Sequence, residues 1–100
     1  MALGRDSWKG IEIDVAGGPR KVPGRNTIHP DALGHPLLSQ AMSAEAYQAR
    51  QDVAALDVPL GRVGVLKEPG YLSVFLASPA AAYITGQTWA VDGGVSIKHP

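Results

Sequence analysis

The feature that most limits how this chain can fold is a pair of short β-prone runs separated by helical sequence. The first run, Arg25–His29, ends at Pro30, and the second, Thr88–Val91, lies between Gly86 and the Asp92–Gly94 turn. When helices separate two strands of one sheet, the chain returns by a crossover, which makes the strands parallel. The order strand, helix, helix, strand therefore predicts an α/β fold in which these two runs are parallel neighbours with a right-handed connection.

Two helical segments are expected between these runs. From Pro36 to about Leu56, apolar side chains recur at spacings of three and four residues, as on one face of a helix. Ser43 offers a second helix start within this stretch, so the pattern fits either one helix or two helices with a bend. The apolar run Tyr71–Ser78 predicts the other helix, and the unfavourable residues before it place its start at about Pro69.

Residues 1–24 differ in composition from the rest of the chain because they are rich in glycine, proline and basic residues. Within them, Ile11–Val15 alternates apolar and acidic side chains, which predicts one short strand. The stretch Gly17–Gly24 matches neither glycine-rich phosphate-binding spacing, so we interpret it as a surface loop. The expected organisation is an unassigned segment over 1–24, an α/β segment over 25–96 and a tail over 97–100.

Composition excludes several classes of function. Nine Lys and Arg residues balance nine Asp and Glu residues, which argues against nucleic acid or an anionic membrane as the main partner. The sequence has no cysteine, so disulfides, thiolate nucleophiles and cysteine-based zinc sites are excluded. It also has no apolar run of about 18 residues and no apolar secretory leader. We therefore expect a cytoplasmic protein without a membrane or nucleic-acid partner.

The polar residues show no complete catalytic or metal-binding pattern. His29, Asp31 and His35 are close in sequence, but His99 is distant, and zinc needs about four ligands on a defined scaffold. The serines have no nucleophile context such as G-x-S-x-G. Tyr47 is followed four positions later by Gln51 and not by lysine. From the residues alone we predict no metal site and no catalytic residue.

Three groups of segments carry a further signal: Arg25–Pro30, then Pro59–Gly64, then Phe75–Ser78 with Tyr83–Thr88 and Val91–Gly94. In order and separation they resemble the C-terminal portion of the short-chain dehydrogenase/reductase family. The resemblance pairs them with the sixth strand and its turn, the loop before the last large helix, and the last helix, final strand and terminal turn. It covers about residues 25–96. It implies the C-terminal part of a Rossmann-like parallel sheet, incomplete here, from an NAD(P)-dependent oxidoreductase.

The resemblance also implies a cofactor-facing loop after the first run. Carried over by position, Pro30, Leu33 and His35 are the expected cofactor-binding residues, with NAD or NADP as the cofactor. Two family residues are replaced here. Asp31 stands where the family has glycine, which adds a negative charge near a phosphate-bearing ligand, and His35 stands where the family has threonine.

The family's other functional residues are missing from this sequence. Neither the glycine-rich dinucleotide turn nor the catalytic Ser with Tyr-x-x-x-Lys is present. We therefore expect a truncated or frame-disrupted part of a longer oxidoreductase, inactive alone and without catalytic residues of its own. The alternative is a non-catalytic oligomerisation module that pairs with itself or with other subunits of the family.

The missing part of the fold predicts exposed apolar surface. In a whole dehydrogenase, helices cover both faces of the parallel sheet, and most of that cover is absent from this sequence. We expect the helix residues Leu72, Phe75 and Leu76 and the strand residues Trp89 and Val91 to be partly exposed. Exposed apolar patches and unpaired strand edges favour association, so a homo-oligomer or another partner subunit is expected.

Overall fold

The computed structural model describes residues 10–18, 20–34 and 36–97. Its described residues form two compact units that alternate along the chain. The first unit combines the described part of residues 1–30 with Lys67–Val91, and the second combines Asp31–Leu66 with the described part of residues 92–100. The expected segment over 25–96 is thus divided between two units, which are described separately below.

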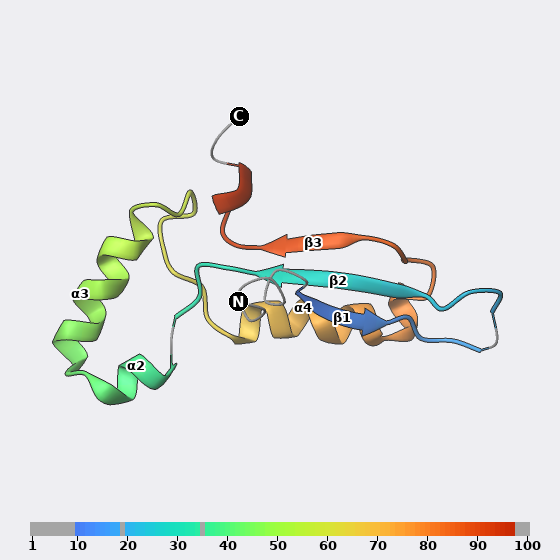
Figure 1. The fold of residues 1–100 in the computed structure, drawn as a ribbon, viewed down its shortest axis with the longest axis horizontal. Coiled ribbons are helices and arrows are strands. Elements are labelled where there is room, and N and C mark those ends of the chain that lie inside the picture. The colour runs from blue at the N-terminus through green and yellow to red at the C-terminus, as the bar shows by residue number, and fades with distance from the viewer. Residues whose placement is uncertain (1–9, 19, 35, 98–100) are drawn as a thin grey trace, which may run out of the picture. The chain divides into compact units, whose positions relative to one another are not determined.

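The first unit is built on a three-stranded sheet in the order β1–β2–β3 (Figure 1). Its strands are β1 (Ile11–Asp14), β2 (Arg25–Pro30) and β3 (Thr88–Val91). Strands β2 and β3 are parallel neighbours, which confirms the pairing expected from the sequence. Strand β1 joins the other edge of β2 in the antiparallel direction, so the complete sheet is mixed.

The core of this unit consists of Ile28, Leu76 and Ala81, all with fully buried side chains. They come from β2, from α4 (Lys67–Ala77) and from the short 3₁₀ helix η2 (Pro79–Ala81), and α4 packs against β1 and β2 (Figure 1). The expectation that Leu76 is partly exposed was therefore wrong. Leu76 lies on the face of α4 that packs on the sheet, whereas Phe75, its neighbour in sequence, is 42% exposed.

The helix α4 begins two residues earlier than the sequence predicts. It starts at Lys67, so Pro69 is its third residue and not its first. The first N–H groups of a helix have no acceptor within the helix, so the missing N–H of a proline costs little there. Pro69 is buried, and its carbonyl accepts a hydrogen bond from the Ser73 hydroxyl at 3.0 Å. The proline is thus accommodated inside the first turn.

The second unit contains two helices, α2 (Pro36–Ala41) and α3 (Ala44–Ala55), followed by loops and the 3₁₀ helix η3 (Val95–Ile97). The hydroxyl oxygen of Ser43 accepts a hydrogen bond from the Ala46 N–H at 3.1 Å, which caps the start of α3. The alternative of two helices with a break at Ser43 is therefore the one adopted. No helix in the described part of the chain is long and apolar enough to cross a membrane.

Burial in the second unit is sparse. None of the residues of α3 is buried. Among the residues of this unit whose burial the structure describes, only Val58 falls in the buried class. The second unit therefore relies on backbone hydrogen bonds in its loops more than on an apolar core.

Candidate functional site

Pro30 lies at the edge of the sheet where ligands bind in folds of this type. Strands β2 and β3 end at Pro30 and Val91, which are partners in the parallel register. Because parallel strands share a direction, both carboxyl ends face the same edge of the sheet. Ligands in open α/β sheets lie beyond this edge. Pro30 is half-buried there, at the position where the chain leaves the first unit.

Leu33 lies in the second unit, in a loop fixed by backbone hydrogen bonds. It forms an isolated parallel bridge with Gly64. The Gly34 N–H donates to the Gly64 carbonyl at 2.8 Å, and the Gly64 N–H donates to the Ala32 carbonyl at 2.9 Å. The third expected cofactor residue, His35, lies outside the described residues. The cofactor-binding role of Pro30, Leu33 and His35 stays a prediction.

The turn just before Leu33 holds an unusual backbone conformation. Ala32 has a φ of 55°, the one positive φ at a non-glycine residue in the described part of the chain. Its N–H donates to the Asp31 carboxylate at 2.7 Å. The exposed Asp31 side chain thus contributes a local hydrogen bond at the turn, in addition to the negative charge that distinguishes it from the family's glycine.

A pocket of about 240 Å³ opens within the second unit beside this loop. Its apolar walls carry three polar side chains from α3, and it is lined by Leu33, Gly34, Leu38, Tyr47, Arg50, Gln51, Ala54 and Val63. A Cβ atom added to Gly34 would lie 3.1 Å from the Tyr47 hydroxyl and 3.3 Å from the Gln51 Nε2 atom, so any larger side chain would crowd these groups. The pocket suits a ligand with an apolar body and a hydrogen-bonding or anionic group.

This pocket is not predicted from the sequence, although Gln51 follows Tyr47 at a spacing of four residues. The cationic member, Arg50, lies three residues after Tyr47 and so shares its helical face, but no motif marks it as a ligand group. The signal available in the sequence is the spacing of Tyr47, Gln51 and Ala54, which brings all three to neighbouring positions on α3. What the sequence does not show is that the Leu33–Gly34 loop lies against them.

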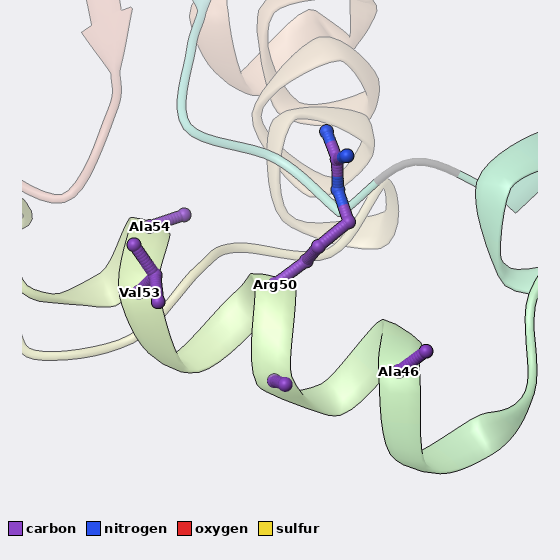
Figure 2. A pocket seen from close by; sticks show the side chains of 5 residues that line it. Ala46, Arg50, Val53 and Ala54 are labelled. Atoms are coloured by element: carbon purple, nitrogen blue, oxygen red, sulfur yellow. The ribbon is translucent and has the colours of Figure 1, made fainter.

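The adjacent face of α3 is also open. A groove of about 490 Å³ is lined by Ala46, Ala49, Arg50, Val53 and Ala54. Figure 2 shows the small apolar side chains projecting from the helix, with the long Arg50 side chain extending away from it. All five residues are exposed. This surface is wide and apolar, and its one charged group is the guanidinium of Arg50.

The terminal glycine turn is fixed against the loop that follows α3. The Leu60 N–H donates to the Gly93 carbonyl at 3.1 Å. A Cβ atom at Gly93 would meet the Val58 Cγ1 atom at 2.5 Å, and one at Gly94 would lie 3.1 Å from Pro59. Both glycines have positive φ values. Two of the segments that carry the family resemblance therefore meet inside the second unit.

Asp92 organises the same turn through its carboxylate. One oxygen accepts from the Gly94 N–H at 2.9 Å and the other accepts from the Ser96 N–H at 3.0 Å. Desolvation acts to raise the pKa of Asp92, but hydrogen bonds from the Ser96 side chain and from the backbone N–H groups of Gly94 and Ser96 outweigh it. The net result is a pKa below its ordinary value. Asp92 is thus a structural carboxylate that caps the η3 turn.

Asn26 is a buried positioning residue that was not predicted from the sequence. It is 1% exposed, its side-chain nitrogen donates to the Ile84 carbonyl at 2.8 Å, and its side-chain oxygen accepts from the Gln87 N–H at 3.2 Å. Both ends of the amide therefore tie the segment before β3 to β2. The signal in the sequence is an asparagine within a β-prone run, where asparagine is otherwise unfavourable.

Arg25, the first residue of β2, links this strand to the antiparallel strand β1. Its guanidinium donates to the Asp14 carboxylate at 2.9 Å and to the Glu12 carboxylate at 3.1 Å. The hydrogen bond and the charge of Asp14 raise the pKa of Arg25, and the charge of Glu12 adds to the effect. Among the described residues, no group of three or more His, Cys, Asp or Glu side chains is arranged to hold a metal ion.

Comparison with known proteins identifies the fold of this arrangement. The family model described as enoyl-(acyl carrier protein) reductase matches residues 24–96. A solved aldohexose dehydrogenase of Thermoplasma acidophilum matches with a TM-score of 0.64 and 30% sequence identity, over 75% of this chain and 32% of the other. A short-chain dehydrogenase/reductase of Brucella melitensis matches with a TM-score of 0.54 and 34% identity, over 70% of this chain and 26% of the other.

Curated relatives give the same assignment from sequence. A tropinone reductase homolog of Arabidopsis thaliana is 42% identical over 73 residues, which are 73% of this chain and 26% of that protein. Another from the same plant is 62% identical over 40 residues, or 40% of this chain and 15% of that protein. The chain spans about a quarter of the length of the first of these relatives. The match over residues 24–96, together with the parallel β2–β3 pair, places this chain in the short-chain dehydrogenase/reductase family.

Proposed function

We propose that this chain is the C-terminal part of an NAD(P)-dependent short-chain oxidoreductase and does not transfer hydride by itself. The observation that carries the proposal is the family match over residues 24–96, in which Pro30 and Val91 share one carboxyl edge. The sequence offers the nicotinamide-side loop of the family but no Tyr-x-x-x-Lys pair and no glycine-rich dinucleotide turn. The proton-transfer and pyrophosphate-binding groups must then come from other sequence.

In this proposal, NAD or NADP meets the chain at Pro30, Leu33 and His35. Two observations support it for the described members of this set. Pro30 ends β2 at the edge where ligands bind in open α/β sheets, and Leu33 lines the 240 Å³ pocket of the second unit. We further propose that this pocket receives the polar end of the substrate. Arg50 and Gln51 supply a cation and an amide donor on its wall.

A second candidate is a non-catalytic oligomerisation module, and one observation favours it. The first unit leaves large apolar side chains in the exposed class although it has a core of its own: Tyr71, Val74 and Phe75 on α4 and Trp89 on β3. Exposed apolar surface of this kind marks protein interaction sites. The partner in this proposal is a second copy or another subunit of the family, in the cytoplasm.

Isothermal titration of the purified chain with NAD and with NADP tests the first proposal. Because the pyrophosphate turn is missing from the sequence, the expected dissociation constant is no tighter than about millimolar. An intact tropinone reductase homolog serves as the positive control. Micromolar binding, or reduction of NADP with a small alcohol substrate, contradicts the proposal that the cofactor site of this chain is incomplete.

Analytical ultracentrifugation separates the two candidates. The oligomerisation module predicts a defined dimer or tetramer, and replacing the exposed Val74 on α4 by Asp weakens it. Replacing Val53 on α3 by Asp is the matched control, because Val53 is also an exposed valine on a helix but lies in the second unit. A chain that stays monomeric at all concentrations rules out the module.

A further inference from the structure

Strand β1, which lies outside the region that matches the family, pairs regularly with strand β2, which lies inside it. Strand β1 lies outside the matched residues 24–96, yet it pairs with β2 along its whole length, from Ile11↔Ile28 to Asp14↔Arg25. This pairing covers the edge of β2 opposite β3 (Figure 1). The outer edge of β2 is therefore occupied by sequence that does not come from the matched region.

The hydrogen-bond pattern shows which backbone groups of β2 this contact uses. The Val15 N–H donates to the Gly24 carbonyl at 2.9 Å, and antiparallel pairs alternate between hydrogen-bonded and non-hydrogen-bonded. The alternation makes Ile13 with Asn26 a hydrogen-bonded pair, so the N–H of Asn26 faces β1. The N–H of Thr27 faces the other way and donates to the Gln87 carbonyl at 2.9 Å.

Side chains hold β1 in this register on both faces. Ile13 packs against the core cluster of the first unit. The exposed Arg25 guanidinium bridges the carboxylates of Glu12 and Asp14 at 3.1 and 2.9 Å. Because β1 is anchored by backbone bonds, an apolar contact and two ion pairs, it blocks this edge of β2 against other strands.

A whole dehydrogenase would place a different strand at the same edge. In the second half of a Rossmann sheet, consecutive strands are neighbours and run parallel. By the resemblance, β2 corresponds to the sixth strand and β3 to the final strand. The strand before β2 would then pair with β2 on the side away from β3. Strand β1 takes that position in the opposite direction and uses the same N–H and carbonyl groups, so the two strands exclude each other.

We propose that the outer edge of β2 is a strand-accepting surface that β1 blocks from within the chain. Its competing occupant is a parallel strand from the part of a short-chain dehydrogenase subunit that precedes the matched region. In this arrangement the chain cannot complete such a subunit until β1 leaves. The proposal rests on the family membership and the β1–β2 pairing, and it requires neither cofactor binding nor catalysis.

Two proline variants test the pairing itself. Ile13→Pro removes a donor from the β1–β2 ladder, whereas Glu12→Pro removes an N–H that faces away from β2. Hydrogen exchange by NMR is the readout. With Ile13→Pro, exchange at Asn26 and Ile28 should accelerate at least tenfold while Thr27 stays protected. With Glu12→Pro, all three should keep their protection. Unchanged exchange at Asn26 and Ile28 in folded Ile13→Pro overturns the proposal.

A charge variant covers the case in which Ile13→Pro unfolds the chain, shown by loss of protection at Thr27 as well. Asp14→Lys places a second cation opposite Arg25 in a non-hydrogen-bonded pair and leaves every backbone donor in place. Asp52→Lys, on the exposed surface of α3, is the matched control. Only Asp14→Lys should accelerate exchange at Asn26 and Ile28.

Binding tests the proposed occupant. The probe is a recombinant tropinone reductase homolog that ends just before its matched region, immobilised for surface plasmon resonance. The opened variant is Ile13→Pro, or Asp14→Lys if Ile13→Pro unfolds, and it should bind at least ten times more tightly than the unmodified chain. The matched control, Glu12→Pro or Asp52→Lys, should behave like the unmodified chain. Equal binding by all variants, or no binding by a folded opened variant, overturns the proposal. Self-association of the opened chain in place of probe binding also overturns it, because the occupant would then be a second copy.

Discussion

The two units of this chain differ in how far they bury their apolar side chains. In the first unit, Ile28 and Leu76 are completely buried between a sheet and a helix. In the second, no residue of α3 is in the buried class, and Leu56, at its C-terminal cap, is 84% exposed. A sheet with one helix across it can therefore make its own core from a small part of a Rossmann fold. The helix pair of the second unit forms no such core, because none of the α3 residues is in the buried class.

This difference predicts a hierarchy of stability within the chain. Segments with few buried apolar contacts open at a lower free energy than the core. We therefore expect the second unit to exchange its amide protons faster than β2 and α4. The changes below test that hierarchy, from the largest expected effect to the smallest.

The largest effect is expected from removing core volume in the first unit. Leu76→Ala should lower the free energy of unfolding by about 2–5 kcal/mol, because it deletes buried methyl groups and leaves a cavity. Leu56→Ala is the control, and it should change stability by no more than about 0.5 kcal/mol because Leu56 is exposed. Urea unfolding followed by circular dichroism gives both values. Equal losses in the two variants would falsify the assignment of the core to the first unit.

A smaller loss is expected from the buried amide that ties β2 to the segment before β3. Asn26→Ala leaves the Ile84 carbonyl and the Gln87 N–H without their partner and should cost about 1–3 kcal/mol. Gln87→Ala is the control because the Gln87 side chain is exposed. Urea midpoints measure both. A neutral Asn26→Ala result would mean that water replaces the amide at no cost.

The turn at Gly93 and Gly94 tests whether close packing stabilises any part of the second unit. Gly93→Ala combines a φ of +63° with a Cβ atom 2.5 Å from the Val58 side chain, so it should destabilise the turn by about 1–2 kcal/mol. Gly70→Ala in α4 meets no atom within 4 Å and should stabilise by up to about 1 kcal/mol. Hydrogen exchange should place the loss of protection caused by Gly93→Ala in the second unit and the gain caused by Gly70→Ala in the first unit. The same sign for both substitutions would contradict this geometry.

The smallest effect is a dependence on pH confined to the second unit. The folded pKa of Asp92 is lowered, so the hydrogen bonds of its carboxylate stabilise the turn above the unfolded pKa. That contribution is lost as the pH falls below about 4, the ordinary range for Asp, and through the lower folded value. The protection factors of the Gly94 and Ser96 amides, which correct for the slower intrinsic exchange in acid, should therefore fall on acidification, and Asp92→Asn should remove this dependence. An unaltered acid response in Asp92→Asn assigns it to another group.

The family elements could be predicted because their signals are local. The pairing of β2 with β3 follows from two β-prone runs with helices between them, and the break before α3 follows from the capping hydroxyl of Ser43. The start of α4 at Lys67 was predicted too late because Pro69 was treated as an interior residue. A proline in the first turn carries no such penalty.

The candidate site was less accessible to prediction because it depends on contacts between distant segments. Leu33 was expected at a ligand, but its bridge to Gly64 joins two loops that no periodicity connects. Asn26 gives one weak local signal, and its partners Ile84 and Gln87 lie far along the chain. Strand β1 was predicted as a strand, yet its pairing with β2 depends on a register that only the folded backbone defines.

The alternation of the two units along the chain has a consequence for the order of folding. Because β2 precedes the segment Asp31–Leu66 whereas α4 and η2 follow it, the core of the first unit cannot close until the residues through Ala81 have been synthesised. The segment Asp31–Leu66 behaves as a long loop that must be closed when α4 reaches the sheet. Loop-closure entropy grows slowly with length, so removing half of that segment would save only about 0.6 kcal/mol. The delay is therefore one of sequence order, because β1 and β2 are synthesised before the helix that packs on them.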